Sequence, residues 1–182
     1  GANRRTTCTF GLRESKDLMA VIADTYERYG SDICIGLHGE SMGAGLQVMA
    51  LEHGPKVDFI INDCGYSEIL PVIRWKVKQG FGLPGWMADA AAPYARLLFG
   101  YWFGDVRPID RLRENEIPIC FVHGTGDNFT AHWHSEKMYE VNKGYKELHL
   151  FEGVDHAECV VADCKRYIQM MKNFVDKVYN ER

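Results

Sequence analysis

A serine, an aspartate and a histidine follow three apolar runs of the chain, in that order. Ser41 lies in the stretch "HGESMGAG", directly after the apolar run "DICIGL". Asp127 follows the run at 117–122, in "FVHGTGDNF", and His156 follows the run at 146–151, in "LFEGVDHAEC". A serine hydroxyl becomes a nucleophile for carbonyl carbon when a histidine takes its proton and an acid orients that histidine. The three residue types therefore predict acyl-transfer chemistry, provided that the fold brings them together.

The serine lies in a G-x-S-x-G motif formed by residues 39–43, between an expected strand and an expected helix. In this context the turn holds the serine in a strained backbone conformation at the top of a sheet. Because strand and helix approach each other closely there, we expect Gly39 and Gly43 both to be required as small residues. The N-terminus of the following helix points toward the serine, where its dipole favours developing negative charge.

Hydrophobic periodicity predicts the elements that must position these residues. Helices are expected over 14–29, 42–53, 130–142 and roughly 160–179, and short buried strands over 33–38, 57–62, 117–122 and 146–151. Strands that alternate with helices indicate an α/β fold with a mainly parallel, doubly wound sheet. The carboxyl ends of parallel strands share one edge, so we expect Ser41, Asp127 and His156 to meet there. This agreement in position and order is stronger support than the motif alone.

Residues 66–116 break the alternation, with four of the six prolines and no clean strand. The segment is too long for a simple connection. We expect a helical cap or lid inserted over the carboxyl ends of the strands, where such sheets bind ligands, within a single domain of residues 1–182. Its aromatic residues are expected to form mainly the core of the cap, and some to line an apolar pocket. The pocket candidates are Glu40, Trp86 and Trp102; the wider aromatic set is Trp75, Phe81, Tyr94, Phe99, Tyr101 and Phe103.

On the stretches "YGSDICIGLHGESMGAG", "IPICFVHGTGDNFT" and "KELHLFEGVDHAEC", the chain resembles the α/β-hydrolase superfamily of serine hydrolases. More narrowly, it is similar to the serine aminopeptidase-like branch, the BEM46-type hydrolases. The resemblance implies Ser41 as the nucleophile, His156 as the general base and acid, and Asp127 as the residue that orients His156. It also implies that the Met42 backbone N–H is one oxyanion-hole donor and that no metal or cofactor is needed.

In that family, further strands and a loop with the second oxyanion donor precede the strand that leads to the serine. The resemblance therefore covers the carboxyl-terminal part of a hydrolase, and we expect a partial sheet. The strand at 33–38 would have a bare edge, which favours a homodimer or a partner segment that pairs there. Removal of one oxyanion donor typically lowers the rate by ~10²–10³, so we expect the chain alone to be weakly active or inactive.

Two other acids compete with Asp127 for the orienting role. Glu152 and Asp155 both precede His156 closely in the chain. The side chain of an adjacent residue such as Asp155 is expected to point elsewhere.

The remaining histidines offer alternatives to a serine mechanism. His132 and His134 suggest a metal pair, but alternate residues on a helix do not face the same side. We expect both at the surface at the start of a helix, and no metal site. His38 and His123 precede glycines at strand ends and are expected to pack beneath the loops.

Composition narrows the classes of partner. The 182 residues are 46% hydrophobic with a net charge of −4 and no basic patch, which argues against a nucleic-acid partner. No apolar run approaches the ~18–20 residues of a membrane span, and the first residues do not resemble a signal peptide. We expect a cytoplasmic protein, although upstream residues could carry an anchor or a signal.

The predicted function is hydrolysis of a small carboxylic ester with an apolar portion, or of an amide. The alternatives are a non-catalytic relative that acts as a binding or assembly module, and an acyltransferase.

Overall fold

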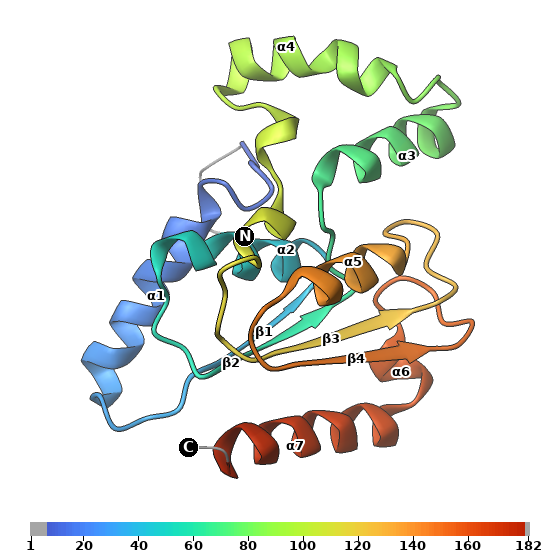
Figure 1. The fold of residues 1–182 in the computed structure, drawn as a ribbon. Helices are drawn as coiled ribbons and strands as arrows, with labels where there is room; N and C mark the ends of the chain where they lie inside the picture. Colours follow the sequence, from blue (N-terminus) through green and yellow to red (C-terminus); the bar gives the residue numbers. More distant parts are fainter. Residues whose placement is uncertain (1–6, 181–182) are drawn as a thin grey trace.

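The structure, a computed structural model, describes residues 7–180 of the chain. Its centre is a sheet of four parallel strands in the order β1 (Gly36–Glu40), β2 (Phe59–Asp63), β3 (Ile119–Gly124) and β4 (Lys146–Phe151). Each strand lies beside the next strand in the sequence (Figure 1). The predicted parallel sheet is confirmed.

The first strand begins and ends later than its apolar residues suggest. The ladder with β2 runs from Gly36 to Glu40, and the Ser41 N–H then donates to the Asp63 carbonyl at 2.9 Å. Apolar runs indicate burial, whereas a strand is defined by its backbone hydrogen bonds, which here continue through polar residues. The pairing therefore carries the chain to Ser41 at the carboxyl edge of the sheet.

Helices cover both faces of this sheet. One face packs against α7 (Cys164–Asn180), and the other packs against α2 (Met42–Met49) and α5 (Trp133–Val141) (Figure 1). Neighbouring residues of one strand point to opposite faces, so Ile61 packs beneath α7 while Ile60 packs toward α2 and α5. The α7 cluster contains Cys120, Val122, Phe151, Tyr167, Met170 and Phe174, and the opposite cluster contains Val48, Leu112, Ile119, Phe121 and Met138. This is the expected doubly wound arrangement.

Two predicted helices are divided in the structure. The helix after Ser41 ends as α2 and continues as the 3₁₀ turn η1 (Ala50–His53), and the last helix is preceded by a separate turn, α6 (Cys159–Ala162). The first helix, α1 (Glu14–Tyr29), has the predicted bounds. Among its apolar and aromatic residues, Ile22 is buried, whereas Val21 and Tyr29 are exposed.

The connection between β2 and β3 holds α3 (Ile69–Phe81), α4 (Met87–Phe99) and the 3₁₀ turns η2 (Phe103–Asp105) and η3 (Pro108–Arg111). We call residues 69–99 the cap hairpin. It stands beyond the sheet, and α4 lies farther from the strands than the start of α3 (Figure 1). The base of the hairpin is fixed by an apolar cluster of Tyr66, Ile69, Val72, Tyr101 and Val106. The Arg13 guanidinium donates to the Phe99 carbonyl at 2.9 Å and ties the end of α4 to the start of α1.

The sheet has β1 at one edge. Among residues 7–180, β1 pairs with β2 alone, and its residues Gly36, His38 and Glu40 are exposed. A partner strand across this edge stays a prediction. In the same residues, no helix combines the length and the apolar character that crossing a bilayer requires.

Candidate active site

The three predicted residues form one hydrogen-bonded chain at the carboxyl ends of the strands. His156 Nε2 lies 2.9 Å from Ser41 Oγ, and His156 Nδ1 lies 2.7 Å from Asp127 Oδ2. Ser41 comes from the turn after β1, Asp127 from the loop after β3, and His156 from the loop after β4. With the Nδ1 proton donated to the carboxylate, Nε2 accepts the hydrogen bond from the serine hydroxyl. This is the geometry that a serine nucleophile requires.

Ser41 is held in a strained conformation. Its φ is 52° and its ψ is −111°, a region that non-glycine residues seldom adopt. The backbone is fixed on both sides, because its N–H donates to the Asp63 carbonyl and its own carbonyl accepts from the Gly45 N–H at 3.1 Å. The sharp turn directs the hydroxyl toward the loop that carries His156.

The two glycines of the motif have different roles. A Cβ added at Gly39 would lie 2.5 Å from the Gly43 carbonyl carbon and 2.8 Å from the Ala44 nitrogen, which is backbone that cannot move aside. A Cβ added at Gly43 would meet nothing within 4 Å. The expectation that both positions must be small is therefore wrong for Gly43. The strand approaches the helix at Gly39, which lies against the backbone of Gly43. A side chain at position 39 would therefore collide with that backbone, whereas a side chain at position 43 would not.

Met42 begins the helix behind the serine. As the first residue of α2, it has no carbonyl one turn earlier in the helix to which its N–H could donate. The dipole of α2 adds to the attraction for negative charge at this end. The Met42 N–H is thus suitably placed to stabilise an oxyanion that forms next to Ser41.

The Asp127 carboxylate is held by four hydrogen bonds. Oδ1 accepts from the backbone N–H groups of Phe129 at 2.8 Å and Thr130 at 2.7 Å, and Oδ2 faces His156 and His123. Burial alone would raise the pKa of Asp127, but the hydrogen bonds from His123, His156 and the Thr130 N–H outweigh it and hold that pKa well below its usual range. The buried carboxylate therefore stays ionised and can orient the imidazole.

The two competing acids do not reach the His156 ring in this structure. The Asp155 carboxylate accepts a hydrogen bond from the backbone N–H of His156 at 2.7 Å, and Glu152 is exposed. The Asp127 carboxylate is the one hydrogen-bonded to Nδ1.

His123 is completely buried beneath the Asp127 loop, as expected from its place at a strand end. Its Nδ1 lies 2.7 Å from Ser135 Oγ, and its Nε2 lies 2.6 Å from the Thr130 carbonyl and 3.1 Å from Asp127 Oδ2. It therefore fixes both the Asp127 loop and one carboxylate oxygen. The sequence placed His123 near the site, but no pattern in it indicated the contact with Asp127.

The expected surface position of His134 is wrong. The helix α5 begins at Trp133 rather than at residue 130, and this start turns His134 inward. Its Nδ1 accepts a hydrogen bond from Ser67 Oγ at 2.8 Å, and burial lowers the pKa of His134 to about 3. His134 is thus a neutral core residue, whereas the side chain of His132 is partly exposed and lies 3.9 Å from Glu136.

Two groups of side chains in the described residues have donor atoms close enough together to hold a metal ion. One is Cys64 with Asp127 and His156, and the other is Cys120 with Glu147 and His149. In the first, the carboxylate and the imidazole bind each other, and burial raises the pKa of Cys64 far above the usual thiol range. In the second, burial raises the pKa of Cys120 to about 12 and Lys177 pairs with Glu147 at 2.6 Å. The structure therefore explains both groups without an ion.

An apolar cavity of about 330 Å³ is connected to the serine turn through one of the residues that line it, Cys8. The Sγ atom of Cys8, which lines it, lies 3.4 Å from the Met42 Sδ atom, and the Tyr101 hydroxyl donates to the Cys8 carbonyl at 3.2 Å. The Phe129 ring, which packs against the same apolar cluster as Tyr101, meets the His156 ring edge-on, with centroids 5.0 Å apart. The cavity is lined by Thr7, Cys8, Phe10, Ile73, Phe99, Tyr101 and Phe103.

None of the three predicted pocket candidates is among the described residues that line this cavity. Trp86 is exposed at the start of α4, Trp102 lies beneath the Arg96 guanidinium, and Glu40 is exposed on β1. Three aromatic residues of the wider predicted set do line it, namely Phe99, Tyr101 and Phe103. The contributions of Cys8 and Phe10 had no recognisable signal in the sequence.

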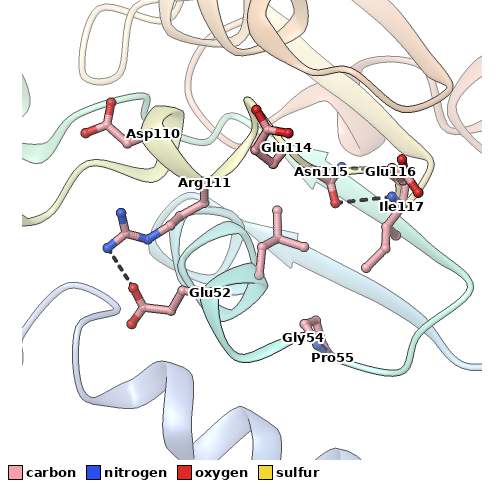
Figure 2. A pocket seen from close by; sticks show the side chains of 10 residues that line it. Glu52, Gly54, Pro55, Asp110, Arg111, Glu114, Asn115, Glu116 and Ile117 are labelled. Atoms are coloured by element: carbon pink, nitrogen blue, oxygen red, sulfur yellow. Dashed lines mark hydrogen bonds and ion pairs between the residues drawn. The ribbon is translucent and has the colours of Figure 1, made fainter.

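A second cavity, of about 410 Å³, lies far from this site. It is lined by residues that precede β2 and β3, such as Pro55 and Ile117, at the opposite end of the sheet (Figure 2). The ion pair of Arg111 with Glu52, at 2.6 Å, closes part of its wall (Figure 2). Its position excludes a direct role at Ser41.

Comparison with known proteins supports the fold. No protein-family model matches the chain. The uncharacterized protein YqkD of Bacillus subtilis (strain 168) is 26% identical over 181 residues, a match that spans 98% of this chain and 59% of YqkD. The esterase Pf2001 of Pyrococcus furiosus aligns with a TM-score of 0.74 and 18% identity over 97% of this chain and 66% of the esterase. The chain has the α/β-hydrolase fold.

The α/β-hydrolase fold is shared with a larger enzyme as well. The acylaminoacyl peptidase of Pyrococcus horikoshii aligns with a TM-score of 0.69 and 19% identity over 93% of this chain and 28% of the peptidase. The chain thus spans less than two thirds of the length of YqkD, of Pf2001 and of the peptidase.

Proposed function

We propose that this protein is a serine hydrolase that cleaves small carboxylic esters through an acyl-enzyme. The observation that carries the proposal is the hydrogen-bonded chain from Ser41 through His156 to the buried Asp127 carboxylate. The strained turn at Ser41 and the hydrolase fold support it. The narrower assignment to the serine aminopeptidase-like, BEM46-type branch is part of the proposal and rests on the sequence motifs.

In the first half of the reaction, His156 Nε2 takes the hydroxyl proton while Ser41 Oγ bonds to the substrate carbonyl carbon. The negative charge that forms on the carbonyl oxygen is stabilised by the Met42 N–H and the N-terminus of α2. When the carbonyl reforms, the bond to the leaving group breaks, and His156 gives its proton to the departing alcohol. Asp127 stabilises the imidazolium between these two transfers.

In the second half, water replaces the alcohol. His156 takes a proton from the water as its oxygen bonds to the acyl carbon, and it then protonates Ser41 Oγ as the ester bond to the enzyme breaks. The carboxylic acid leaves and the free serine is restored.

The apolar cavity beside Met42 supports a substrate with an apolar acyl or alcohol portion. Its lining is mainly aromatic, and one of its lining residues, Cys8, contacts the residue after the nucleophile. Amides are the second candidate substrates, because the fold neighbours include an acylaminoacyl peptidase and the same steps cleave an amide bond.

The cavity predicts a preference for acyl chain length. A butyrate ester of p-nitrophenol should have a kcat/KM about tenfold above that of the acetate ester, because two more methylene groups leave water. The substitution Ile73→Trp narrows the cavity and should abolish this gain. The matched control Ile168→Trp, on the exposed side of α7, should keep it. Equal values for the two esters in the parent protein would contradict the assigned pocket.

The pH dependence of kcat/KM should follow the protonation of the His156 imidazole. The hydrogen bond to Asp127 raises the pKa of His156 above the usual value of 6.5; burial opposes this effect, and the charges of Glu40 and Asp155 add to it. Because only the neutral imidazole accepts the serine proton, kcat/KM should fall with decreasing pH around a midpoint above 6.5. Removal of one nearby charge by Glu40→Gln should lower the midpoint, and Glu114→Gln, on the distant side, should not change it. A midpoint below 6.5 in the parent protein would contradict this assignment.

The alternative function is a non-catalytic relative that acts as a binding or assembly module. The exposed edge of β1 favours it, because an unpaired strand can pair with another chain. Such a module would keep the fold but would not form a covalent adduct at Ser41 with a serine-directed reagent.

A further inference from the structure

The helix α4 shows the reverse of the usual burial pattern. Its small residues Ala88, Ala92 and Ala95 face inward and are at most 7% exposed. Its large apolar residues Leu97 and Leu98 are 81% and 69% exposed. A helix that packs on a core normally turns its large apolar side chains toward that core. The outward face of α4 therefore has the composition of a contact surface.

The same apolar character continues along the cap hairpin. Phe81 and Trp86, around the turn between the two helices, are 71% and 65% exposed, and Tyr94 is 67% exposed. The hairpin is the part of the fold that stands away from the sheet (Figure 1). Large exposed apolar patches mark sites where proteins bind other proteins or membranes. We call Phe81, Trp86, Tyr94, Leu97, Leu98 and Phe99 the outer apolar face.

The charge of the hairpin differs from that of the rest of the chain. Residues 69–99 contain four cations and a single anion, whereas the whole chain has 21 cations and 25 anions. The anion, Asp89, is paired with Arg74 at 2.5 Å. Of the remaining cations, Lys76 lies over the Phe129 ring and Arg96 over the Trp102 ring, and the described residues give neither of them, nor Lys78, a carboxylate partner. The hairpin therefore has a net positive charge on a protein that is otherwise acidic.

The combination of exposed apolar side chains and positive charge distinguishes a lipid surface from a second copy of the chain as the partner of the hairpin. Tryptophan, tyrosine and phenylalanine beside lysine and arginine are typical of surfaces that lie in the headgroup region of a bilayer, where anionic lipids attract the cations. A second copy bound through the same face would bring two positively charged hairpins together, which is unfavourable. We propose that the cap hairpin docks on an anionic lipid surface, with its outer apolar face in the interfacial layer.

Docking at this face would also bring the apolar cavity close to lipid. Phe99 belongs to the outer apolar face and to the lining of the cavity beside Met42. Apolar esters that concentrate in the lipid would then reach the cavity directly. This last consequence rests on the proposed function, whereas the docking itself does not.

Flotation with lipid vesicles tests the docking. The purified protein should float with vesicles of equimolar phosphatidylcholine and phosphatidylglycerol and not with vesicles of phosphatidylcholine alone. The double substitution Leu97→Ser with Leu98→Ser should weaken binding by at least about tenfold, because two exposed leucines no longer enter the apolar layer. Lys76→Gln with Lys78→Gln should weaken it by about tenfold as well. The control Val21→Ser with Val161→Ser, which changes two comparably exposed residues elsewhere, should bind like the parent.

Two results would overturn the proposal. One is the absence of binding to the anionic vesicles. If, in addition, light scattering shows a dimer that the Leu97 and Leu98 substitutions dissociate, the outer apolar face is an interface between two copies of the chain. The other is equal binding by the parent and the leucine variant. Labelling of Ser41 by a fluorophosphonate, measured on the same samples without lipid, reports on the proposed catalytic serine independently of either result.

Discussion

Replacement of Ser41 by alanine should reduce ester hydrolysis to the uncatalysed rate, because removal of the nucleophile from a fully active triad lowers kcat by about 10⁶-fold. The Ser41 hydroxyl is bonded to His156, and alanine tolerates the strained turn no worse than serine does. The variant should therefore fold and melt like the parent. Rates with p-nitrophenyl butyrate and thermal melts of both proteins measure the two effects.

A matched control separates this loss from a general effect of serine replacement. Ser31→Ala changes an exposed serine just before β1 and should leave kcat unchanged. Hydrolysis by Ser41→Ala at the parent rate would show that the activity does not use this serine.

The substitution Asp127→Asn should lower kcat by about 10⁴-fold, the loss found when an amide replaces the acid of a serine triad. The amide introduced at position 127 would favour the other tautomer of His156, in which Nε2 carries the proton and cannot accept the proton of Ser41. The acidic limb of the pH profile should also shift to lower pH, because the hydrogen bond from His156 to Asp127 is the main cause of the raised pKa of His156. Steady-state rates across the pH range measure both effects.

Asp155→Asn is the matched control for the orienting acid. Asp155 accepts a hydrogen bond from the backbone N–H of His156, and the asparagine side-chain carbonyl can still accept it. This variant should keep most of the activity. Loss of activity in Asp155→Asn together with full activity in Asp127→Asn would show that Asp155, and not Asp127, orients His156.

The candidate site was predictable because its three residues are fixed by sheet topology. Each follows an apolar run, and the ends of parallel strands lie at one edge whatever the side chains between them do. The same reasoning located His123 beneath a loop, but not its contact with Asp127. That contact depends on how the loop at 125–130 folds back over His123. The hydrogen bonds from His123 to Asp127 and Thr130 do not belong to a helix or to a strand pairing, so the sequence pattern does not predict them.

The lining of the proposed substrate cavity was predictable only in part. The aromatic content of 66–116 indicated a cap, but the residues that line the cavity depend on which way each short helix rotates. The structure turns the alanines of α4 inward and leaves Trp86 exposed, against the usual pattern for a helix on a core. Cys8 and Phe10 reach the cavity because Glu14 accepts hydrogen bonds from the N–H groups of Thr9 and Gly11, a local arrangement that residue types alone do not predict.

The most direct test of the proposed serine mechanism is whether the Ser41 hydroxyl is activated. The purified protein and its Ser41→Ala variant are incubated with a fluorophosphonate, and the mass of each intact protein is measured. We predict one stoichiometric adduct on the parent and none on the variant, because His156 and Asp127 make this serine nucleophilic. A folded parent protein that forms no adduct, or a variant that is labelled equally, would contradict the assignment of Ser41 as the catalytic nucleophile.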